Sequence, residues 1–382
     1  MSELDLTSLG FLNPSQTRII VAMSGGVDSS VTAALLHEAG FNVIGITLQL
    51  YDYGMSLGKK GACCAGQDIY DASIVAEKFG FPHYVLDYES VFKESVIEDF
   101  ADSYLRGETP IPCVRCNQRV KFRDLFKVAK DLGGDALATG HYVERRLGQN
   151  GPELHRAQNS KKDQSYFLFA TTSEQLDYLR FPLGHLTKEE TRTHAHRLGL
   201  NVADKPDSQD ICFVPNGNYA QVVEKLRPGA LESGEILDEM GRVLGQHSGI
   251  INFTVGQRKG LNLSSNPNNG DPLYVIRLNP KKHQVIVGPQ SSLAKKEIDL
   301  HDVNWLDQIP FEDSISCTVK VRSAQEPLPA TASLNLIKKT AKITFEEPEF
   351  GVSAGQACVF YKNSQVLGGG WITTHKGDEH ES

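Results

Sequence analysis

One strand, turn and helix near the start of the chain restricts the fold more than any other feature. "RIIVAM" (residues 18–23) is an apolar run rich in β-branched residues, "SGGVDSS" (24–30) follows it, and "SVTAALLHEAG" (30–40) has a helical pattern. A buried strand that leads through such a turn into a helix is typical of α/β proteins. The unpaired N–H groups and the dipole at the start of that helix favour an anion, and phosphate in particular.

The residue types of the turn narrow the kind of phosphate site. Gly25 and Gly26 allow a ligand close to the backbone, and the hydroxyls of Ser24, Ser29 and Ser30 can add hydrogen bonds. No Gly-Lys-Ser/Thr follows, which argues against a Walker loop, and the third spaced glycine of a dinucleotide fingerprint is missing. The alternative is a serine-capped glycine turn without a ligand.

The rest of the first 200 residues repeats the alternation of strand and helix. Further buried strands are predicted at 42–50, 83–88 and 135–140. The stretch 117–134 is expected to be a helix whose apolar face comprises Val120, Leu125, Val128 and Leu132. Thr187 and Glu190 form a capping box that begins another helix, and a loop containing Cys212 is expected after it. This pattern predicts a doubly wound parallel sheet with ligands at the carboxyl ends of its strands.

After about residue 220 the pattern changes to short strands separated by Gly, Asn and Pro. We therefore predict a catalytic domain over 1–220, a small central β-rich domain over 221–285, and a C-terminal β-barrel-like domain over 286–382.

Composition and charge restrict the expected cellular location, the cysteine chemistry and the mode of RNA binding. No stretch approaches the roughly 20 apolar residues of a membrane span, and the start lacks a secretory signal, so we expect a cytoplasmic protein without a membrane partner. The 7 cysteines include close pairs, which favours thiol or metal chemistry over a disulfide framework. A net charge of −8 leaves RNA binding to local basic clusters at 145–146, 161–162 and 319–322.

The turn also carries a family resemblance. "SGGVDSS" resembles the PP-loop of ATP pyrophosphatases, which cleave ATP between the α and β phosphates and adenylate a carbonyl oxygen. Within that superfamily the chain resembles the tRNA-uridine 2-sulfurtransferase (MnmA/TrmU) family, and the resemblance extends over about residues 19–372. The supporting stretches are "TPIPCVRCNQRVKF", "ATGHY", "KKDQSYFL", "DSQDICFV", "GQHSGIINFTVGQRKGL" and "AGQACVFYKNSQVLGGGWI".

The resemblance implies ATP-dependent 2-thiolation of the wobble uridine, position 34, of tRNA. AMP would be transferred to the C2 oxygen, and a sulfur nucleophile would then displace it. ATP, Mg²⁺, tRNA and a sulfur donor such as a cysteine desulfurase relay protein are the implied ligands and partners. The implied ATP-binding residues are Ala22, Met23, Ser24, Gly25, Gly26, Val27, Asp28, Ser29, Leu48 and Gly140.

Two cysteines match the sulfur-carrying positions of the family. Cys212 is the implied persulfide carrier, and Cys116 is the implied nucleophile that attacks the persulfide. Both need a thiolate, so a nearby positive charge or a helix N-terminus should depress at least one pKa. Cys116 is expected just before the helix predicted from Asn117.

The chain departs from the family motif "TPNPDxxCN" at two positions. Cys113 replaces the Asp, which would be a general base or an Mg²⁺ ligand, and Ile111 replaces the Asn. Cys113, Cys116 and Cys212 could therefore instead hold an iron–sulfur cluster, or with a histidine a zinc ion. The persulfide route is preferred, and no metal ligand is assigned.

The resemblance implies tRNA contacts from all parts of the chain, and a pocket lined by "TPIPC" for the unstacked base. The alternative for His141 is a structural hydrogen bond, and for the turn at 162–164 a solvated loop. Cys317 and Cys358 are predicted to pack inside strands, and Cys63 and Cys64 receive no role. The implied tRNA-binding residues are Ile111, Pro112, His141, Lys162, Asp163, Gln164, Arg322, Ser323 and Gln356.

Two other functions compete with this one. The first is a different PP-loop enzyme that adenylates a small molecule or another tRNA base. The second is a tRNA-binding protein with an inactive ATP loop.

Overall fold

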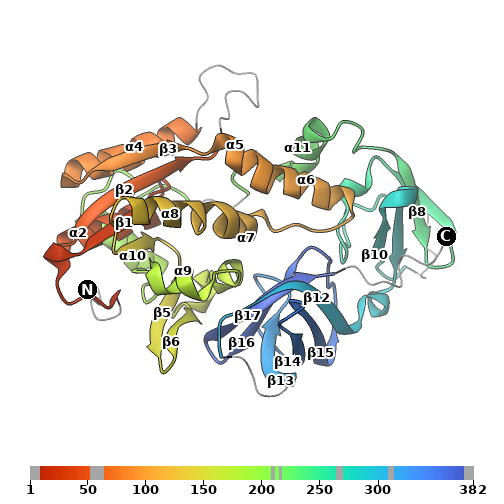
Figure 1. Cartoon of the computed structure of the whole chain (residues 1–382). Coiled ribbons are helices and arrows are strands. Elements are labelled where there is room, and N and C mark those ends of the chain that lie inside the picture. The colour runs from red at the N-terminus through yellow and green to blue at the C-terminus, as the bar shows by residue number, and fades with distance from the viewer. Residues whose placement is uncertain are drawn as a thin grey trace.

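The N-terminal part of the chain is built on a parallel sheet (Figure 1). The structure is a computed structural model and describes residues 9–51, 64–207, 211–214, 217–263, 270–308 and 314–373. The strand order is β3-β2-β1-β4-β7, and all the pairings are parallel. The first four strands confirm those predicted from the sequence. The bounds are β1 Arg18–Ala22, β2 Asn42–Gln49, β3 His83–Asp87, β4 Ala136–Thr139 and β7 Leu179–Arg180.

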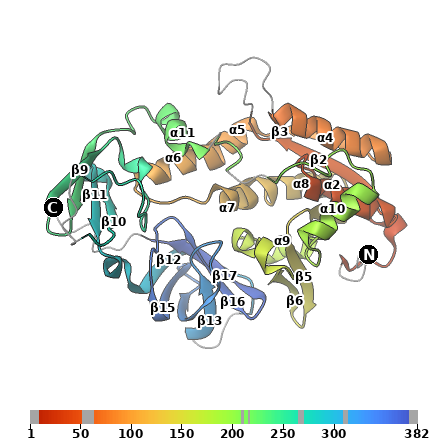
Figure 2. The same cartoon turned by 180° about the vertical axis from the view of Figure 1, so that it is seen from behind.

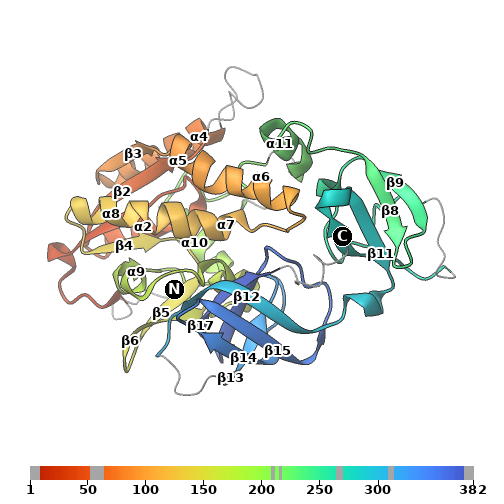
Figure 3. The same cartoon turned by 45° about the vertical axis from the view of Figure 1, so that its right-hand side comes forward.

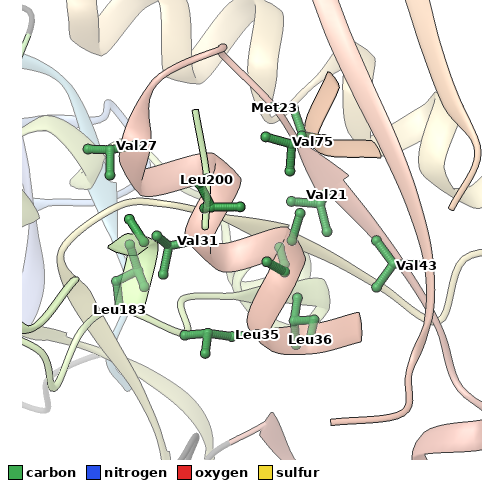
Figure 4. Close-up of a cluster of buried hydrophobic side chains, with 14 of the residues drawn as sticks. Val21, Met23, Val27, Val31, Leu35, Leu36, Val43, Val75, Leu183 and Leu200 are labelled. Atoms are coloured by element: carbon green, nitrogen blue, oxygen red, sulfur yellow. The ribbon is translucent and has the colours of Figure 1, made fainter. Parts of the chain in front are cut away.

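Helices cover both faces of this sheet, which confirms the doubly wound class. On one face α2 (Val27–Glu38), α4 (Cys64–Phe79) and α10 (Lys188–Arg197) pack on β1 and β2. Figure 4 shows that core, with Val21 of β1 facing side chains of α2. On the other face lie α8 (Asp124–Asp131) and α9 (Ser173–Tyr178). The capping box of Thr187 and Glu190 begins α10, as predicted.

The prediction of one continuous helix over 117–134 is wrong. Helix α7 (Pro112–Cys116) runs directly into a π-helical turn, η3 (Asn117–Lys121), and two turn residues then separate it from α8. The break rotates the apolar face. Val120 therefore packs in a different core from Leu125.

A second core joins the catalytic part to the central β-rich part (Figure 3). Aromatic residues of the helical stretch 89–105 pack there with the four strands of the sheet ordered β10-β11-β8-β9. Helix α11 (Tyr219–Leu226) supplies Val223 to the same core. The helical elements are α5 Glu89–Phe92, η2 Lys93–Ile97 and α6 Glu98–Leu105, and the strands are β8 Gly234–Asp238, β9 Val243–His247, β10 Tyr274–Asn279 and β11 Gln284–Gly288.

The C-terminal strands close into a barrel, as predicted (Figure 2). The order is β12-β15-β14-β13-β16-β17, and β12 also pairs with β17, which removes both edges. The hairpin of β5 (Val143–Gly148) and β6 (Gly151–Arg156) extends this sheet at β17. The barrel bounds are β12 Lys295–Trp305, β13 Ser314–Lys320, β14 Leu328–Asn335, β15 Thr340–Glu349, β16 Ala357–Lys362 and β17 Gln365–Ile372.

Candidate active site

The glycine-serine turn (residues 24–30) lies at the carboxyl end of β1 and opens α2, as the sequence predicted. Ala22 ends the strand, and the N–H of Met23 still bonds to the carbonyl of Ile46 at 2.8 Å. Gly25 has φ +71°, and a Cβ there would lie 2.2 Å from the carbonyl oxygen of Asp68. Only glycine fits this position, because the turn packs directly on the start of α4.

The hydroxyls of the turn organise its backbone. The N–H of Ser24 donates to Oγ of Ser29 at 3.0 Å, and the Ser29 hydroxyl donates to the carbonyl of Gly26 at 3.2 Å. Gly26 is the N-cap of α2, and no side chain caps the helix there. The first N–H groups of α2 therefore remain available to an anion.

Asp28 in the turn is held by residues distant in sequence. Its Oδ1 accepts a hydrogen bond from the Tyr142 hydroxyl at 2.8 Å and one from the Lys188 ammonium at 2.7 Å. Lys188 is buried and also pairs with Asp207 at 2.7 Å. Desolvation of Asp207 opposes its ionisation, but hydrogen bonds from Lys188 and Lys162 lower its pKa to about 2. Asp207 is thus ionised at neutral pH, and Lys188 pairs with both Asp28 and Asp207.

A second lysine holds the turn from the side of α4. The Lys205 ammonium donates to the carbonyl of Gly25 at 3.0 Å and to carboxylates of Asp68 and Asp71. Lys188, Lys205 and Asp207 were not expected at this site from the sequence. "DKPDS" (204–208) contains Lys205 and Asp207, but no spacing in it indicates that Lys205 reaches Gly25 or that Asp207 reaches Lys188.

The predicted ATP residues outside the turn lie beside it. Gly140 follows β4, and a Cβ there would lie 2.8 Å from the backbone of Asp28 and Ser29, so β4 packs on the turn without a side chain between them. Leu48 lies near the carboxyl end of β2 and is half-buried. These positions agree with an adenine nucleotide at the sheet edge, which stays a prediction.

His141 follows Gly140 just after β4 and contacts Thr139 and Phe122. Its Nδ1 lies 2.9 Å from Oγ1 of Thr139, and its ring contacts Phe122 edge-on. Burial, with a smaller effect of the Lys121 charge, lowers the pKa of His141 to about 3. The imidazole is therefore neutral at physiological pH and can stack or form hydrogen bonds but does not attract phosphate by charge.

Cys116 is not placed just before a helix, contrary to expectation. It is the last residue of α7, inside a continuous helical stretch, and it is buried in the core that also contains Phe213. Because Phe213 is next to Cys212, this core brings together residues 116 and 212, which are 96 positions apart. Burial raises the pKa of the Cys116 thiol.

Cys113, Cys116 and Cys212 form the thiol cluster of this chain. Cys113 and Cys212 are exposed and interact electrostatically with one another. Desolvation raises the pKa of Cys113, and for Cys212 desolvation together with the neighbouring thiols raises the pKa to about 12. The expected net depression of a thiol pKa is therefore wrong for this structure, because desolvation outweighs the one nearby charge, that of Lys121.

The described residues do not provide a metal site. Within the ranges given above, no group of three or more His, Cys, Asp or Glu side chains is arranged to hold a metal ion. Asp28 is occupied by Lys188 and Tyr142, so Mg²⁺ would depend mainly on nucleotide phosphates for its ligands.

The segment before α7 is attached to the C-terminal barrel. The N–H of Thr109 donates to the carbonyl of Ala354 at 2.8 Å, and Nε2 of Gln356 donates to the carbonyl of Thr109 at 2.9 Å. The Arg115 guanidinium lies 3.9 Å from the ring centroid of Trp371. Ile111 and Pro112 are buried, so the barrel fixes the segment that leads into the thiol cluster.

The turn at residues 162–164 has structural contacts. Lys162 pairs with Asp207 at 2.9 Å. Asp163 bonds to Arg156 at 3.0 Å and to the N–H of Ser165, and Oε1 of Gln164 accepts from the N–H of Tyr142 at 2.8 Å. The predicted tRNA contacts of these three residues stay predictions.

The basic clusters expected for RNA are smaller than the sequence indicated. Arg145 is buried and donates to the carbonyl of Leu176, and Lys320 is buried in β13. Arg322 is about half exposed, with a side-chain exposure of 48%, and pairs with Glu349, while Ser323 is exposed. The tRNA contacts proposed for Arg322, Ser323 and Gln356 remain untested.

The other cysteines lie away from this site or outside the described part. Cys317 in β13 and Cys358 in β16 are buried in the barrel core, as predicted. Cys63 lies outside the described residues, and Cys64 begins α4. No described helix is both long and apolar enough to span a bilayer.

Comparison with known families defines the class of protein first. Residues 17–216 match a family model described as a tRNA methyl transferase HUP domain, 222–289 match a PRC-barrel domain of the same family, and 295–372 match an aminomethyltransferase β-barrel domain. The chain therefore combines a HUP-type sheet with two β-domains.

The relatives define the family. The tRNA-specific 2-thiouridylase MnmA of Rhodospirillum centenum is 63% identical over 372 residues, which cover 96% of this chain and 94% of that protein. The protein of the same name from Paracoccus denitrificans is 60% identical, over 97% and 96% of the two chains. The chain belongs to this family of sulfurtransferase enzymes, which confirms the resemblance.

One solved structure has a weak similarity in fold to this chain. A 4-thiouridine synthetase–RNA complex with bound ATP has a TM-score of 0.35 and 16% identity, and the match covers 55% of this chain and 50% of that one.

Proposed function

We propose that the chain thiolates the C2 position of the wobble uridine of tRNA in an ATP-dependent reaction. The observation that carries the proposal is the packing of β4 on the glycine-serine turn together with the charge of Lys121, which acts on residues at both the end of β4 and the thiol cluster. Gly140 packs on the turn, His141 follows it, and the Lys121 charge acts both on His141 and on the three thiols. Relatives about 60% identical over nearly the whole chain are named 2-thiouridylases.

The turn performs the first half of the reaction. The N–H groups at the start of α2 bind ATP phosphates, and Lys188 and Lys205 hold the turn rigid from outside. The C2 oxygen of uridine attacks the α-phosphorus, a new O–P bond forms, and pyrophosphate leaves with the electrons of the broken bond. Mg²⁺ bound with ATP would neutralise phosphate charge.

The thiol cluster performs the second half. A relay protein supplies sulfur as a persulfide on Cys212, and the Cys116 thiolate attacks the Cys212 sulfur. A Cys116–Cys212 disulfide forms and sulfide is released, so two thiols lose the two electrons that the transferred sulfur gains. Sulfide adds to C2 and AMP leaves with the C–O electrons. A dithiol reductant restores both cysteines.

Two further features support tRNA as the substrate. Ile111 and Pro112 precede the thiol cluster and are fixed by the barrel, so a base can be held there without loop closure. The neutral His141 ring can stack on a base or hydrogen-bond to it. The roles of Lys162, Asp163, Gln164, Arg322, Ser323 and Gln356 in tRNA binding belong to the same proposal.

Mass spectrometry of tRNA tests the proposal. A strain that lacks this gene should lose 2-thiouridine, the wild-type gene should restore it, and Cys212→Ser should not. Unchanged 2-thiouridine after deletion would reject the function. A PP-loop enzyme that adenylates a small molecule predicts pyrophosphate release without tRNA, one that adenylates another tRNA base predicts release with tRNA but unchanged 2-thiouridine after deletion, and a non-catalytic tRNA-binding protein predicts no release.

Iron analysis decides between the two routes for sulfur. Protein purified without oxygen should contain no stoichiometric iron or acid-labile sulfide. Stoichiometric iron that is lost in Cys113→Ser would replace the persulfide route with the cluster.

A further inference from the structure

A single cation in the α7–η3 stretch remains without a carboxylate partner. Arg115 and Arg119 of this stretch both face Asp99, at 3.6 and 3.3 Å. Lys121 is half-buried and makes no hydrogen bond or ion pair with another described residue. Its charge is therefore not neutralised by the part of the protein that the structure describes.

The π-helical turn directs Lys121 toward the cysteines. In an uninterrupted α-helix Lys121 would lie about 140° around the axis from Cys116, on another face. The N–H of Phe122 instead bonds to the carbonyl of Asn117 at 2.8 Å, five residues back. A π turn absorbs one extra residue, which returns Lys121 to within about 40° of Cys116 and to the side that bears Cys113.

The electrostatic contacts agree with this geometry. The Lys121 charge lowers the pKa of Cys113, Cys116 and Cys212, each against a larger effect of desolvation. It also lowers the pKa of His141, the residue after Gly140 beside the glycine-serine turn. The charge of one ammonium group thus favours the thiolate form of all three cysteines.

We propose that Lys121 is the counter-ion of the anionic sulfur species in this site, which rests on the function proposed above. Thiolate, persulfide and released sulfide each carry negative charge in a desolvated pocket where the resting thiols are neutral. An unpaired ammonium beside them lowers the cost of forming each anion and keeps released sulfide near the activated base. The π turn is the local structure that makes this possible, because it turns residue 121 toward the cysteines.

Replacing Lys121 by a neutral side chain tests the assignment. Lys121→Gln removes the charge, Lys121→Arg keeps it, and Lys127→Gln on the exposed side of α8 removes a lysine away from the thiols. In the full-length reduced protein, iodoacetamide labelling of the accessible Cys113 and Cys212 is followed by mass spectrometry at neutral pH. The thermal midpoint of each variant checks the fold.

The labelling rate reports the thiolate directly. Lys121→Gln should slow labelling about tenfold, the equivalent of about one pKa unit, and 2-thiouridine formation at least as much. Pyrophosphate release with ATP and tRNA should stay at the wild-type rate, Lys121→Arg should recover most of both losses, and Lys127→Gln should behave as wild type.

Three results would overturn the role of Lys121. The first is unchanged labelling in Lys121→Gln, and the second is an arginine variant as slow as the glutamine variant. A parallel loss of pyrophosphate release would assign Lys121 to adenylation instead and would also overturn it. If the wild type forms no 2-thiouridine, the proposed function fails, and the labelling comparison still decides whether Lys121 stabilises thiolates.

Discussion

The glycine-serine turn and the thiol cluster lie in connected parts of one site but differ in how they are built. The turn is continuous in sequence, its hydroxyls bond to its own backbone, and its carboxylate is paired with Lys188. The thiol cluster joins α7 to a loop 96 residues later, and Lys121, whose charge acts on it, has no carboxylate partner among the described residues. The proposed nucleotide end is thus charge-compensated, whereas the proposed sulfur end keeps a charge for reacting groups.

The largest expected effect is on sulfur transfer, which replacement of Cys116 or Cys212 should abolish while adenylation continues. Cys116→Ser and Cys212→Ser should each reduce 2-thiouridine formation at least about a thousandfold, because a hydroxyl cannot replace a sulfur nucleophile or carrier. Pyrophosphate release measured in the same samples should persist. Cys317→Ala in the barrel is the control and should keep both activities. Loss of both activities in the serine variants would mean that the two ends do not act separately.

A glycine substitution should break the nucleotide end alone. Gly25→Ala forces a Cβ against the backbone of Asp68 at a positive φ, and we expect at least about a tenfold weaker affinity for ATP by calorimetry, which corresponds to 1.4 kcal/mol. Gly40→Ala is matched in conformation, with φ +87° and its nearest atom at 4.0 Å, and should leave ATP binding unchanged. Equal binding by Gly25→Ala would contradict the steric role of Gly25.

Lowering the pH should weaken the ion pairs that Asp207 forms with Lys188 and Lys162. The folded pKa of Asp207 is lowered from 3.8 to about 2, so its stabilisation is complete above about pH 4 and is lost as the pH falls toward 2. Asp207→Asn should therefore cost about 2 kcal/mol of unfolding free energy at neutral pH and much less near pH 2. Urea unfolding at both pH values measures this. Asp204→Asn, at an exposed position, should show no such dependence.

The smallest effect concerns the support of α7 by the barrel. Arg115→Gln removes the stacking on Trp371 and should lower the unfolding free energy by about 1 kcal/mol. Arg123→Gln, which loses only an exposed pair with Asp124, should change it by less than about half of that. Equal thermal shifts for the two variants would show that the stacking contributes nothing particular to the position of α7.

Local patterns explain which features were predictable. Strands β1 to β4, the turn and the capping box of Thr187 follow from residue periodicity and side-chain chemistry within a few positions. The π turn at residues 117–121 does not, because Val120, Leu125, Val128 and Leu132 fit the period of one uninterrupted helix, and only packing shows that they enter different cores. Arg145 and Lys320 appeared to be surface charges, and only their packing shows that both are buried.

The sequence by itself determined the strand-turn-helix at residues 18–38, the change from α/β to β near residue 220, and the cysteines that can carry sulfur. The tertiary structure decided which charges face them. Lys188 and Lys205 pair with the carboxylates around the turn, whereas Lys121, whose charge acts on the thiols, has no carboxylate partner in the part of the chain that the structure describes. The physical reason is that a Coulomb interaction depends on distance and burial in three dimensions, and sequence spacing constrains neither across about 100 residues.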